Sequence, residues 1–140
     1  ERITLEVTEG YFIQNPARAR WTIDRLKAIG VKIALDDFGA GFSSVGYLRQ
    51  FGFDRMKIDR SLVAAVHDSV KARDLLQATV AMARALDIPV TAEGIEEERQ
   101  ALALRSCGCD EMQGFHFGRP APAAEIAALL SERGGRVIAA

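Results

Sequence analysis

Strand-like and helix-like segments alternate along the whole of this 140-residue chain. Apolar runs typical of strands occupy residues 3–9, 31–37, 54–58, 89–94 and 110–113. Helical spacing of apolar residues occupies 16–29, 69–86, 96–104 and 123–130; Trp21 belongs to the predicted apolar face of the first of these helices and Leu75 to that of the second. A serine of the turn 38–44 can cap a short helix that runs through Leu48. Strands separated by helices pair in parallel, because the chain must cross back over the sheet before the next strand begins. The short connections predict one α/β domain without an internal boundary.

Each strand-like segment carries polar or charged residues near its carboxyl end. They are Glu6, Asp36, Asp37, Lys57, Asp59, Glu93 and Gln113. Parallel strands covered by helices are apolar almost throughout, so these residues need a reason. Active sites of β/α barrels and of open α/β sheets lie at this edge of the sheet. The pattern predicts an enzyme site whose chemistry is mostly acidic.

The neighbouring carboxylates Asp36 and Asp37 are the sharpest local signal. Adjacent residues on a strand point to opposite faces, so both can reach one site only where the strand ends and the chain turns. Two such carboxylates repel each other unless a cation neutralises them, and oxygen ligands of this kind suit magnesium or manganese. For this pair alone, a helix cap and a solvent-exposed aspartate are the preferred interpretation.

Glu6 and Glu93 favour the metal site over the helix cap, because a barrel-like sheet would bring them to the same rim as Asp36. Alone, Glu6 is explained by an exposed edge strand and Glu93 by capping of the next helix. Together, three or four converging carboxylates with a lysine and an amide match a two-metal hydrolytic site.

Lys57 lies between Met56 and Ile58 on a short strand. A surface lysine with a buried stem is a fair alternative to an ammonium near a metal-bound water or a phosphate. Asp59 lies on the same strand face and could orient it. The glycine loop 39–41 could cradle phosphate through backbone N–H groups, although a tight turn is about equally expected.

Composition excludes several functional classes. A formal net charge of -1 gives no electrostatic footprint for DNA or RNA, and no apolar run approaches the ~20 residues that span a bilayer. Cys107 and Cys109 lie too close together for an unstrained disulfide and provide too few ligands for zinc. Buried thiols in a reducing cytosol are the expected state.

The length raises a further expectation. Five β/α units are too few to close an eight-stranded barrel, so roughly three units would be missing if the fold is a barrel. The chain also begins inside a strand, at Glu1, without a methionine. We therefore expect a fragment of a longer polypeptide, with exposed sheet edges that favour association.

Five motifs occur in a fixed order: LEVTE, ALDDFGAGFSS, MKIDR, TAEGIE and QGFHFGRP. Together they closely resemble the EAL-domain family of bacterial cyclic di-GMP phosphodiesterases, over the chain up to about Ala124. The resemblance implies that residues 1–140 are the C-terminal portion, about five β/α units, of a TIM-like (β/α)8 barrel. It also implies two divalent cations, Mg²⁺ or Mn²⁺, and hydrolysis of cyclic di-GMP to linear pGpG. The family's first metal-binding glutamate and a metal-binding asparagine lie upstream of these motifs.

The resemblance also implies a role for individual residues. Four are metal ligands: Glu6, Asp36 as the bridge between both metals, and Asp37 and Glu93 on the second metal. Five act beside the metals: Lys57 on the nucleophilic water, Glu9 on the DDFGAGFSS loop, Glu96 in support of its motif, Gln113 in the water network and Asp59 as a supporting residue. His67 and His116 match no catalytic role, and Phe42 replaces a tyrosine found in many relatives.

Alternatives remain at this stage. A degenerate EAL domain would bind cyclic di-GMP or a protein partner without hydrolysis, although every visible ligand position is filled. An unrelated phosphate-handling barrel is a weaker alternative. The resemblance further implies a homodimer through the EAL domain, upstream sensory or cyclase domains, and a cytoplasmic location, with a tether to the inner membrane in absent segments. We expect the 140 residues alone to be inactive.

Overall fold

The computed structural model describes residues 3–41 and 45–132. Within these residues the strands are β1 (Thr4–Thr8), β2 (Lys32–Phe38), β3 (Arg55–Ile58), β4 (Val90–Ala92) and β5 (Glu111–Met112). The helices are α1 (Glu9–Gln14), α2 (Pro16–Ala28), α3 (Val45–Phe51), α4 (Arg60–Val63), α5 (Val70–Arg84), α6 (Glu98–Ser106) and α7 (Ala123–Glu132). The predicted α/β alternation is therefore confirmed.

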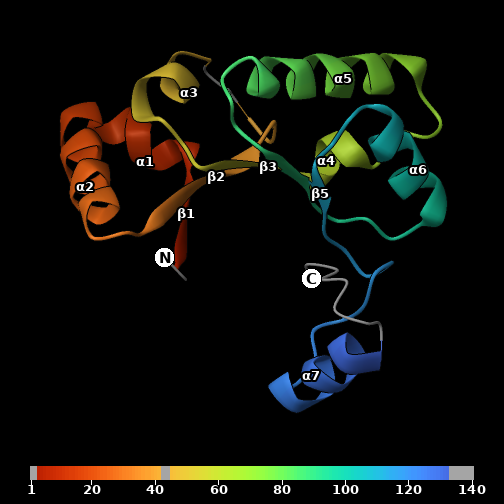
Figure 1. The fold of residues 1–140 in the computed structure, drawn as a ribbon. Coiled ribbons are helices and arrows are strands. Elements are labelled where there is room, and N and C mark those ends of the chain that lie inside the picture. Colours follow the sequence, from red (N-terminus) through yellow and green to blue (C-terminus); the bar gives the residue numbers. More distant parts are fainter. Residues whose placement is uncertain (1–2, 42–44, 133–140) are drawn as a thin grey trace.

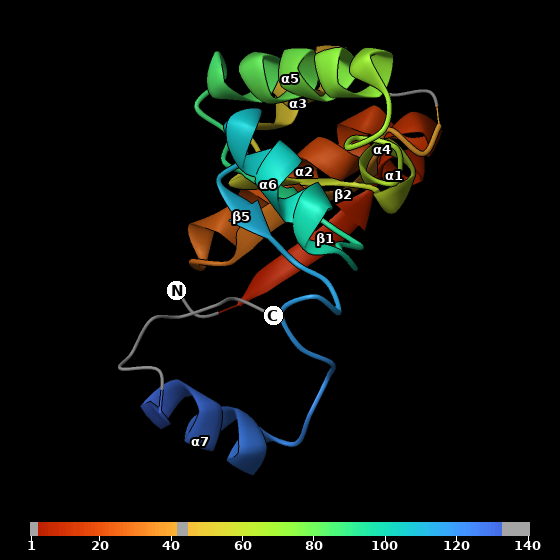
Figure 2. The same ribbon diagram turned by 90° about the vertical axis from the view of Figure 1, so that its right-hand side faces the viewer.

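All five strands form one parallel sheet in the order β1-β2-β3-β4-β5. Each strand pairs with the next one along the chain. Helices α1 to α6 gather on one side of this sheet, and α7 lies apart on the opposite side (Figures 1 and 2). The other face of the sheet therefore carries none of these six helices.

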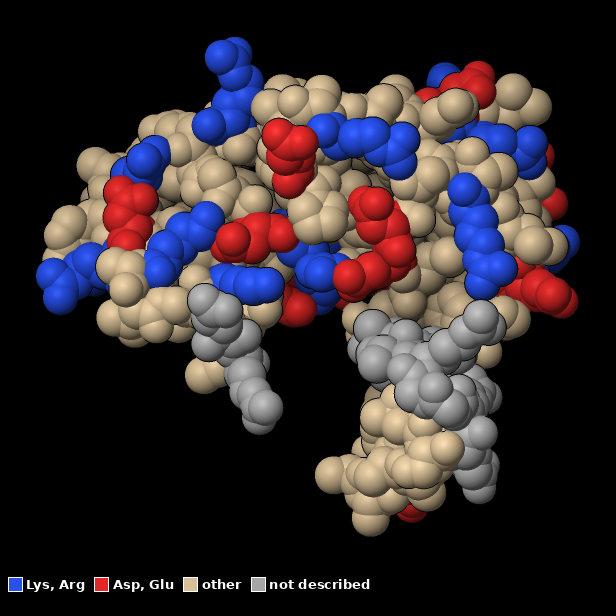
Figure 3. Space-filling view, viewed as in Figure 1, with Lys and Arg blue, Asp and Glu red and all other residues tan. Residues whose placement is uncertain are grey.

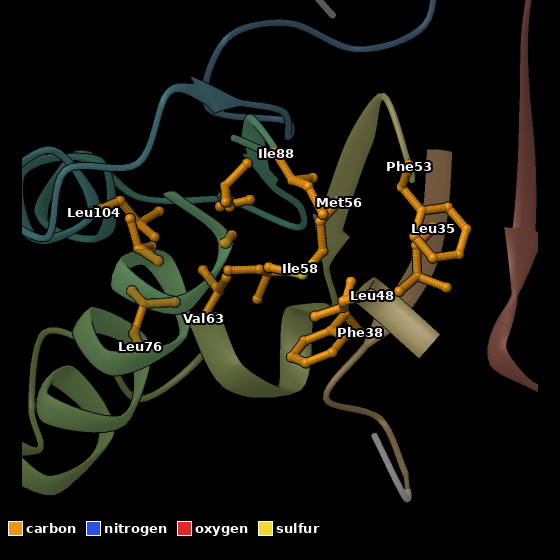
Figure 4. Packing of buried hydrophobic residues seen from close by; sticks show 14 of the residues in the cluster. Leu35, Phe38, Leu48, Phe53, Met56, Ile58, Val63, Leu76, Ile88 and Leu104 are labelled. Carbon is orange, nitrogen blue, oxygen red and sulfur yellow. The ribbon is translucent and has the colours of Figure 1, made fainter. Parts of the chain in front are cut away.

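The hydrophobic core fills the space between the sheet and the helices. Alternate strand residues point into it, among them Leu35, Met56 and Ile58, all at most 1% exposed. Figure 4 shows these side chains packed beside Leu48 and Leu76 from α3 and α5. Because one side of each strand is committed to this core, the other side is free to carry the polar residues.

Side-chain caps fix where the helices begin. Asn15 accepts a hydrogen bond of 3.0 Å from the backbone N–H of Arg18, and Pro16 follows as the first residue of α2. Ser69 caps α5 in the same way, through the N–H of Ala72. The predicted start of α2 after Asn15 is confirmed. The serine cap predicted for the helix through Leu48 falls on residues 43–44, outside the described residues.

Two local predictions differ from the structure, and one helix was not predicted. Periodicity placed Leu75 on the buried face of α5, but Leu75 is 54% exposed, and the buried face is formed by Leu76, Thr79, Val80 and Ala83. Trp21, predicted to lie on the apolar face of α2, is 61% exposed. Helix α1 was not predicted at all. Its anchor is the fully buried Phe12, whose ring packs on Phe51 and Phe53, a long-range contact that local sequence does not reveal.

The loops that follow β4 and β5 approach each other closely at Gly114. The N–H of Ile95 donates to the carbonyl of Gln113, and the N–H of His116 donates to the carbonyl of Ile95. A Cβ atom at Gly114 would lie 2.0 Å from the carbonyl oxygen of Ile95. The residue must therefore be glycine for these two loops to pair, and this pairing fixes the backbone of Gln113.

We predict that Gly114→Ala lowers the free energy of unfolding by about 1–3 kcal/mol, the usual cost of forced overpacking. Gly10→Ala is the matched control, because a Cβ there meets nothing within 4 Å and alanine favours the helix α1. Chemical denaturation of both variants measures the difference. Equal stability of the two variants would contradict the close approach at Gly114.

Among the described helices, none has the length and hydrophobicity needed to cross a membrane.

Candidate active site

The polar strand ends meet on the face of the sheet opposite the main core. In the view of Figure 3, acidic side chains surround basic ones at the centre of the molecule. Lys57 stands on β3, and three carboxylates reach it from other strand segments: Glu6 from β1, Asp36 from β2 and Glu93 just after β4. The predicted convergence of these residues at one site is therefore present.

The ammonium group of Lys57 is the centre of this cluster. Its Nζ lies 2.7 Å from Glu6 Oε2, 2.7 Å from Glu93 Oε1 and 3.3 Å from Asp36 Oδ1, and the residue is only 7% exposed. Burial by itself would lower the pKa of Lys57, but the hydrogen bonds to Glu6 and Glu93 and the negative charges of Glu93 and Asp36 outweigh burial and raise that pKa. Lys57 is therefore a buried ammonium, and the alternative of a surface lysine is excluded.

A bulge in β2 allows Asp36 and Asp37 to serve one site. The pairing of β2 with β3 shifts register between Leu35 and Phe38, and Asp37 adopts a left-handed backbone with φ of 56°. The strand then continues to Phe38, which pairs with Ile58. The expectation that β2 ends at the aspartate pair was wrong. The bulge within the strand, and not the strand end, turns both carboxylates toward the site.

The carboxylate oxygens fit a divalent cation. One oxygen each from Asp36, Asp37 and Glu93 lies within 4.8 Å of the others. Asp36 Oδ1 is buried without a hydrogen bond, although Lys57 Nζ lies 3.3 Å away; at that distance the pair is electrostatic and not a well-directed hydrogen bond. Glu6, Asp36 and Glu93 contact the ammonium of Lys57, and Asp37 joins the last two in the oxygen cluster, so four carboxylates gather around one ammonium with an excess of three negative charges. Hard cations such as Mg²⁺ and Mn²⁺ suit this set of oxygen donors.

Glu6 is not part of the oxygen cluster of Asp36, Asp37 and Glu93. Its carboxylate contacts Lys57 and is half-exposed. Glu6 also lines a hollow of about 160 Å³ together with Lys57 and Gln113. Glu6 and Gln113 are therefore close to the cluster without forming its compact centre.

Asp59 does not orient Lys57. Its carboxylate accepts a hydrogen bond of 2.9 Å from the N–H of Ser61 and so caps α4. A hydrogen bond from the side chain of Ser61, followed by the one from its backbone N–H, lowers the pKa of Asp59. The predicted partnership of Asp59 with Lys57 was wrong, because the chain turns into α4 directly after Asp59.

Two other predicted site residues lie outside the oxygen cluster. Glu96 lines a separate hollow with Phe115 and Arg119. Glu9 is the first residue of α1, and part of the loop that it was predicted to steady, residues 42–44, lies outside the described residues, as does Phe42. In the described part of the turn, the N–H of Ala40 donates to the carbonyl of Asp37.

The two histidines lie away from the cluster. His67 Nε2 is 2.9 Å from Asp68 Oδ2, and the exposed His116 packs its ring on Phe117.

Comparison with known proteins decides the family. The family described as "EAL domain" matches residues 1–120 of this chain. The chain belongs to the EAL domain family. It is 38% identical over 128 residues to the cyclic di-GMP phosphodiesterase NbdA of Pseudomonas aeruginosa, covering 91% of this chain and 16% of that protein.

Two solved EAL structures have the same fold. The EAL domain of Mycobacterium smegmatis DcpA superposes with a TM-score of 0.86 at 38% identity, over 96% of this chain and 59% of that one. The Klebsiella pneumoniae BlrP1 complex with manganese and cyclic di-GMP superposes with a TM-score of 0.80 at 36% identity, over 85% and 30% of the two chains. This chain is thus an α/β sheet that forms part of the TIM barrel of EAL domains. It spans 15–19% of the length of several curated relatives.

Three polar residues of this EAL domain were missed by the sequence analysis: Arg55, Thr91 and Glu111. Arg55 donates hydrogen bonds to Thr91 and to Glu111. In the sequence they lie two residues before the predicted site residues Lys57, Glu93 and Gln113, respectively. Residues two apart on a strand share a face, so the same periodicity could have identified them.

The cysteines of this EAL domain are free, as predicted. Cys107 is buried, and the thiol of Cys109 donates to the carbonyl of Glu111 at 3.1 Å. Burial is the main reason that the pKa of Cys109 rises from 9.0 to about 11. The reactive species is the thiolate, so Cys109 is an unreactive thiol near neutral pH.

We predict that Cys109 in a Cys107→Ala background reacts with iodoacetamide at pH 8 about 100-fold more slowly in the folded protein than in guanidinium, because two pKa units reduce the thiolate fraction by that factor. The folded state retains this proton when the unfolded state has lost it. The free energy of unfolding should therefore fall as the pH rises from about 9 to about 11, and Cys109→Ala should remove this fall. Equal alkylation rates in both states would contradict the buried thiol.

Proposed function

We propose that the complete domain hydrolyses cyclic di-GMP to linear pGpG with two divalent cations, Mg²⁺ or Mn²⁺. The observation that carries this proposal is the convergence of Glu6, Asp36 and Glu93 on Lys57, with Asp37 turned to the same site by the β2 bulge. Two similar proteins support it: NbdA is a cyclic di-GMP phosphodiesterase, and the BlrP1 structure is a complex with manganese and cyclic di-GMP.

The residues present would divide into two groups around the cations. Asp36, Asp37 and Glu93 would hold one cation, and Glu6 with Asp36 would contribute to the other. Bound cations of this kind supply Lewis-acid chemistry and lower the pKa of a coordinated water. The acidic cluster is then neutralised, which removes its repulsion toward a phosphodiester.

Lys57 would act on the reacting oxygens. Its Nζ is held in place by three carboxylates from three strand segments, so its position is defined before substrate binds. As an ammonium it donates hydrogen bonds, and it would orient the attacking water or a phosphate oxygen. Hydrolysis adds this water to one phosphorus and breaks the bond to the ribose 3′ oxygen. The product carries a 5′ phosphate and a 3′ hydroxyl.

The competing proposal is a domain that binds cyclic di-GMP or a protein partner without hydrolysis. A site that only binds has no need of the charge excess around Lys57. Because Asp36, Asp37 and Glu93 all remain carboxylates within 4.8 Å of one another, the hydrolytic function is the better supported of the two.

The experiment that separates them uses the complete protein that contains this sequence. We expect Mg²⁺ or Mn²⁺ to support conversion of cyclic di-GMP to pGpG, followed by chromatography, and EDTA to stop it. Tight binding of cyclic di-GMP without any pGpG in either metal would establish the binding function instead. The same preparation tests the proposed homodimer by its mass in solution. Upstream sensory or cyclase domains and a cytoplasmic location remain proposals from the family.

A further inference from the structure

A second polar network lies on the same sheet face as Lys57. Arg55 Nη1 donates to Thr91 Oγ1 at 2.7 Å and forms an ion pair with Glu111, and Thr91 Oγ1 lies 3.4 Å from Glu111. These residues come from β3, β4 and β5. Arg55 therefore reaches across β4 to the strand beyond it.

The carboxylate of Glu6 is the second one beside the hollow that Arg55 lines. In the sheet register, Glu6 pairs with Ala34 and Ala34 pairs with Arg55, so only the small Ala34 separates them along this row. Neighbouring strands are about 4.8 Å apart, which puts the backbones of Glu6 and Arg55 about 10 Å apart. Both side chains line the same hollow of about 160 Å³, together with Lys57 and Glu111.

We propose that Glu111, assisted by Thr91, is a positioning residue that holds Arg55 toward β5 and so keeps Glu6 available for a cation. This inference rests on the proposed metal-dependent function. Arg55 and Lys57 are two cations on one face of β3, and each takes different carboxylates: Lys57 takes those of the site, and Arg55 takes Glu111.

The reason is competition for Glu6. A guanidinium that loses its carboxylate partner inside a partly enclosed hollow is left as an unpaired charge, which is unfavourable. An ion pair with another carboxylate would stabilise it. Glu6 is the other carboxylate among the residues that line this hollow, and only Ala34, which has a small side chain, separates it from Arg55 in the sheet register. An ion pair between Arg55 and Glu6 would occupy oxygens that a divalent cation requires. Glu111 prevents this exchange, because its ion pair with Arg55 holds the guanidinium on the β5 side of the hollow.

The test measures Mn²⁺ binding by calorimetry in the complete protein. We expect Glu111→Gln, which removes the charge and keeps the size, to weaken Mn²⁺ binding at least tenfold. The double variant Arg55→Gln with Glu111→Gln should restore it to within threefold of the wild type, because the competing cation is gone. Thr91→Val should weaken binding in the same direction by a smaller factor. Glu98→Gln, on the exposed start of α6, is the matched control and should not change it.

A purely structural role would give a different pattern. If Glu111 only supports the sheet, the double variant would bind Mn²⁺ no better than Glu111→Gln, and this result would overturn the inference. Wild-type Mn²⁺ binding in Glu111→Gln would also overturn it. Should Glu111→Gln fail to fold, Thr91→Val and the double variant decide the question, and wild-type binding in Thr91→Val would then overturn it. A wild type that binds Mn²⁺ without producing pGpG would refute the proposed function and leave this comparison intact.

Discussion

Hydrolysis of cyclic di-GMP by the complete protein should fall by about 1,000-fold or more when Asp36 is replaced by asparagine, the scale on which loss of an electrostatic group reduces turnover. Asp36 contacts Lys57 and also belongs to the oxygen cluster with Asp37 and Glu93. Its buried Oδ1 has no hydrogen bond, so the charge that asparagine removes is the feature that a cation would use. Asparagine keeps the size of the side chain, and the fold should be preserved. Turnover in Mn²⁺ and circular dichroism measure the two effects.

Asp24→Asn is the control for Asp36→Asn. Asp24 is exposed on α2, where it pairs with Arg20, and surface pairs of this kind contribute little. Its replacement should leave turnover unchanged within a factor of two. Near-normal turnover in folded Asp36→Asn would refute the assignment of Asp36 as the residue shared by two cations.

Replacement of Lys57 by alanine should reduce the chemical step by about 100-fold or more, the scale on which loss of one positioned hydrogen-bond donor reduces turnover. Binding of cyclic di-GMP should stay within about tenfold of the wild type, a change of about 1.4 kcal/mol. The reason is that Lys57 is held by Glu6, Asp36 and Glu93 at the centre of the carboxylate cluster, where its proposed role is to orient the reacting oxygens and not to anchor the nucleotide. Single-turnover kinetics and calorimetry with a non-activating cation separate the two quantities.

Lys57→Ala should also change stability in a way that depends on metal. Without Lys57 the carboxylates lose their only ammonium partner among the described contacts of the cluster, and they repel one another. We expect the variant to be less stable than the wild type in EDTA and to recover stability in Mn²⁺. Complete loss of nucleotide binding in a folded variant would instead make Lys57 a phosphate anchor.

Most of the strand and helix pattern was accessible from local sequence. The run at 31–37 and the helical spacing at 69–86 each matched an element of the structure to within about two residues, β2 and α5. Apolar strands and capped helices are local signals, because the periodicity and the cap lie within one segment. Local sequence failed at α1, where Phe12 is fixed by Phe51 and Phe53, some forty residues away.

The candidate site divides in the same way. Local sequence identifies the charged residues at the carboxyl ends of the strands, because Glu6, Lys57 and Glu93 are anomalies in otherwise apolar segments. Strand order then brings them together, because each strand pairs with its successor.

The pairing of those charges, in contrast, depends on the folded sheet. The β2 bulge and the left-handed backbone conformation of Asp37 bring Asp36 and Asp37 to one site. Neither feature can be predicted from two neighbouring aspartates in the sequence. Asp59 caps α4 instead of serving Lys57, while Arg55 reaches across β4 to Glu111. The physical reason is that a side chain's type and strand face are local properties, whereas its partner depends on register, backbone twist and the competing groups within a few ångströms, which exist only once the sheet has formed.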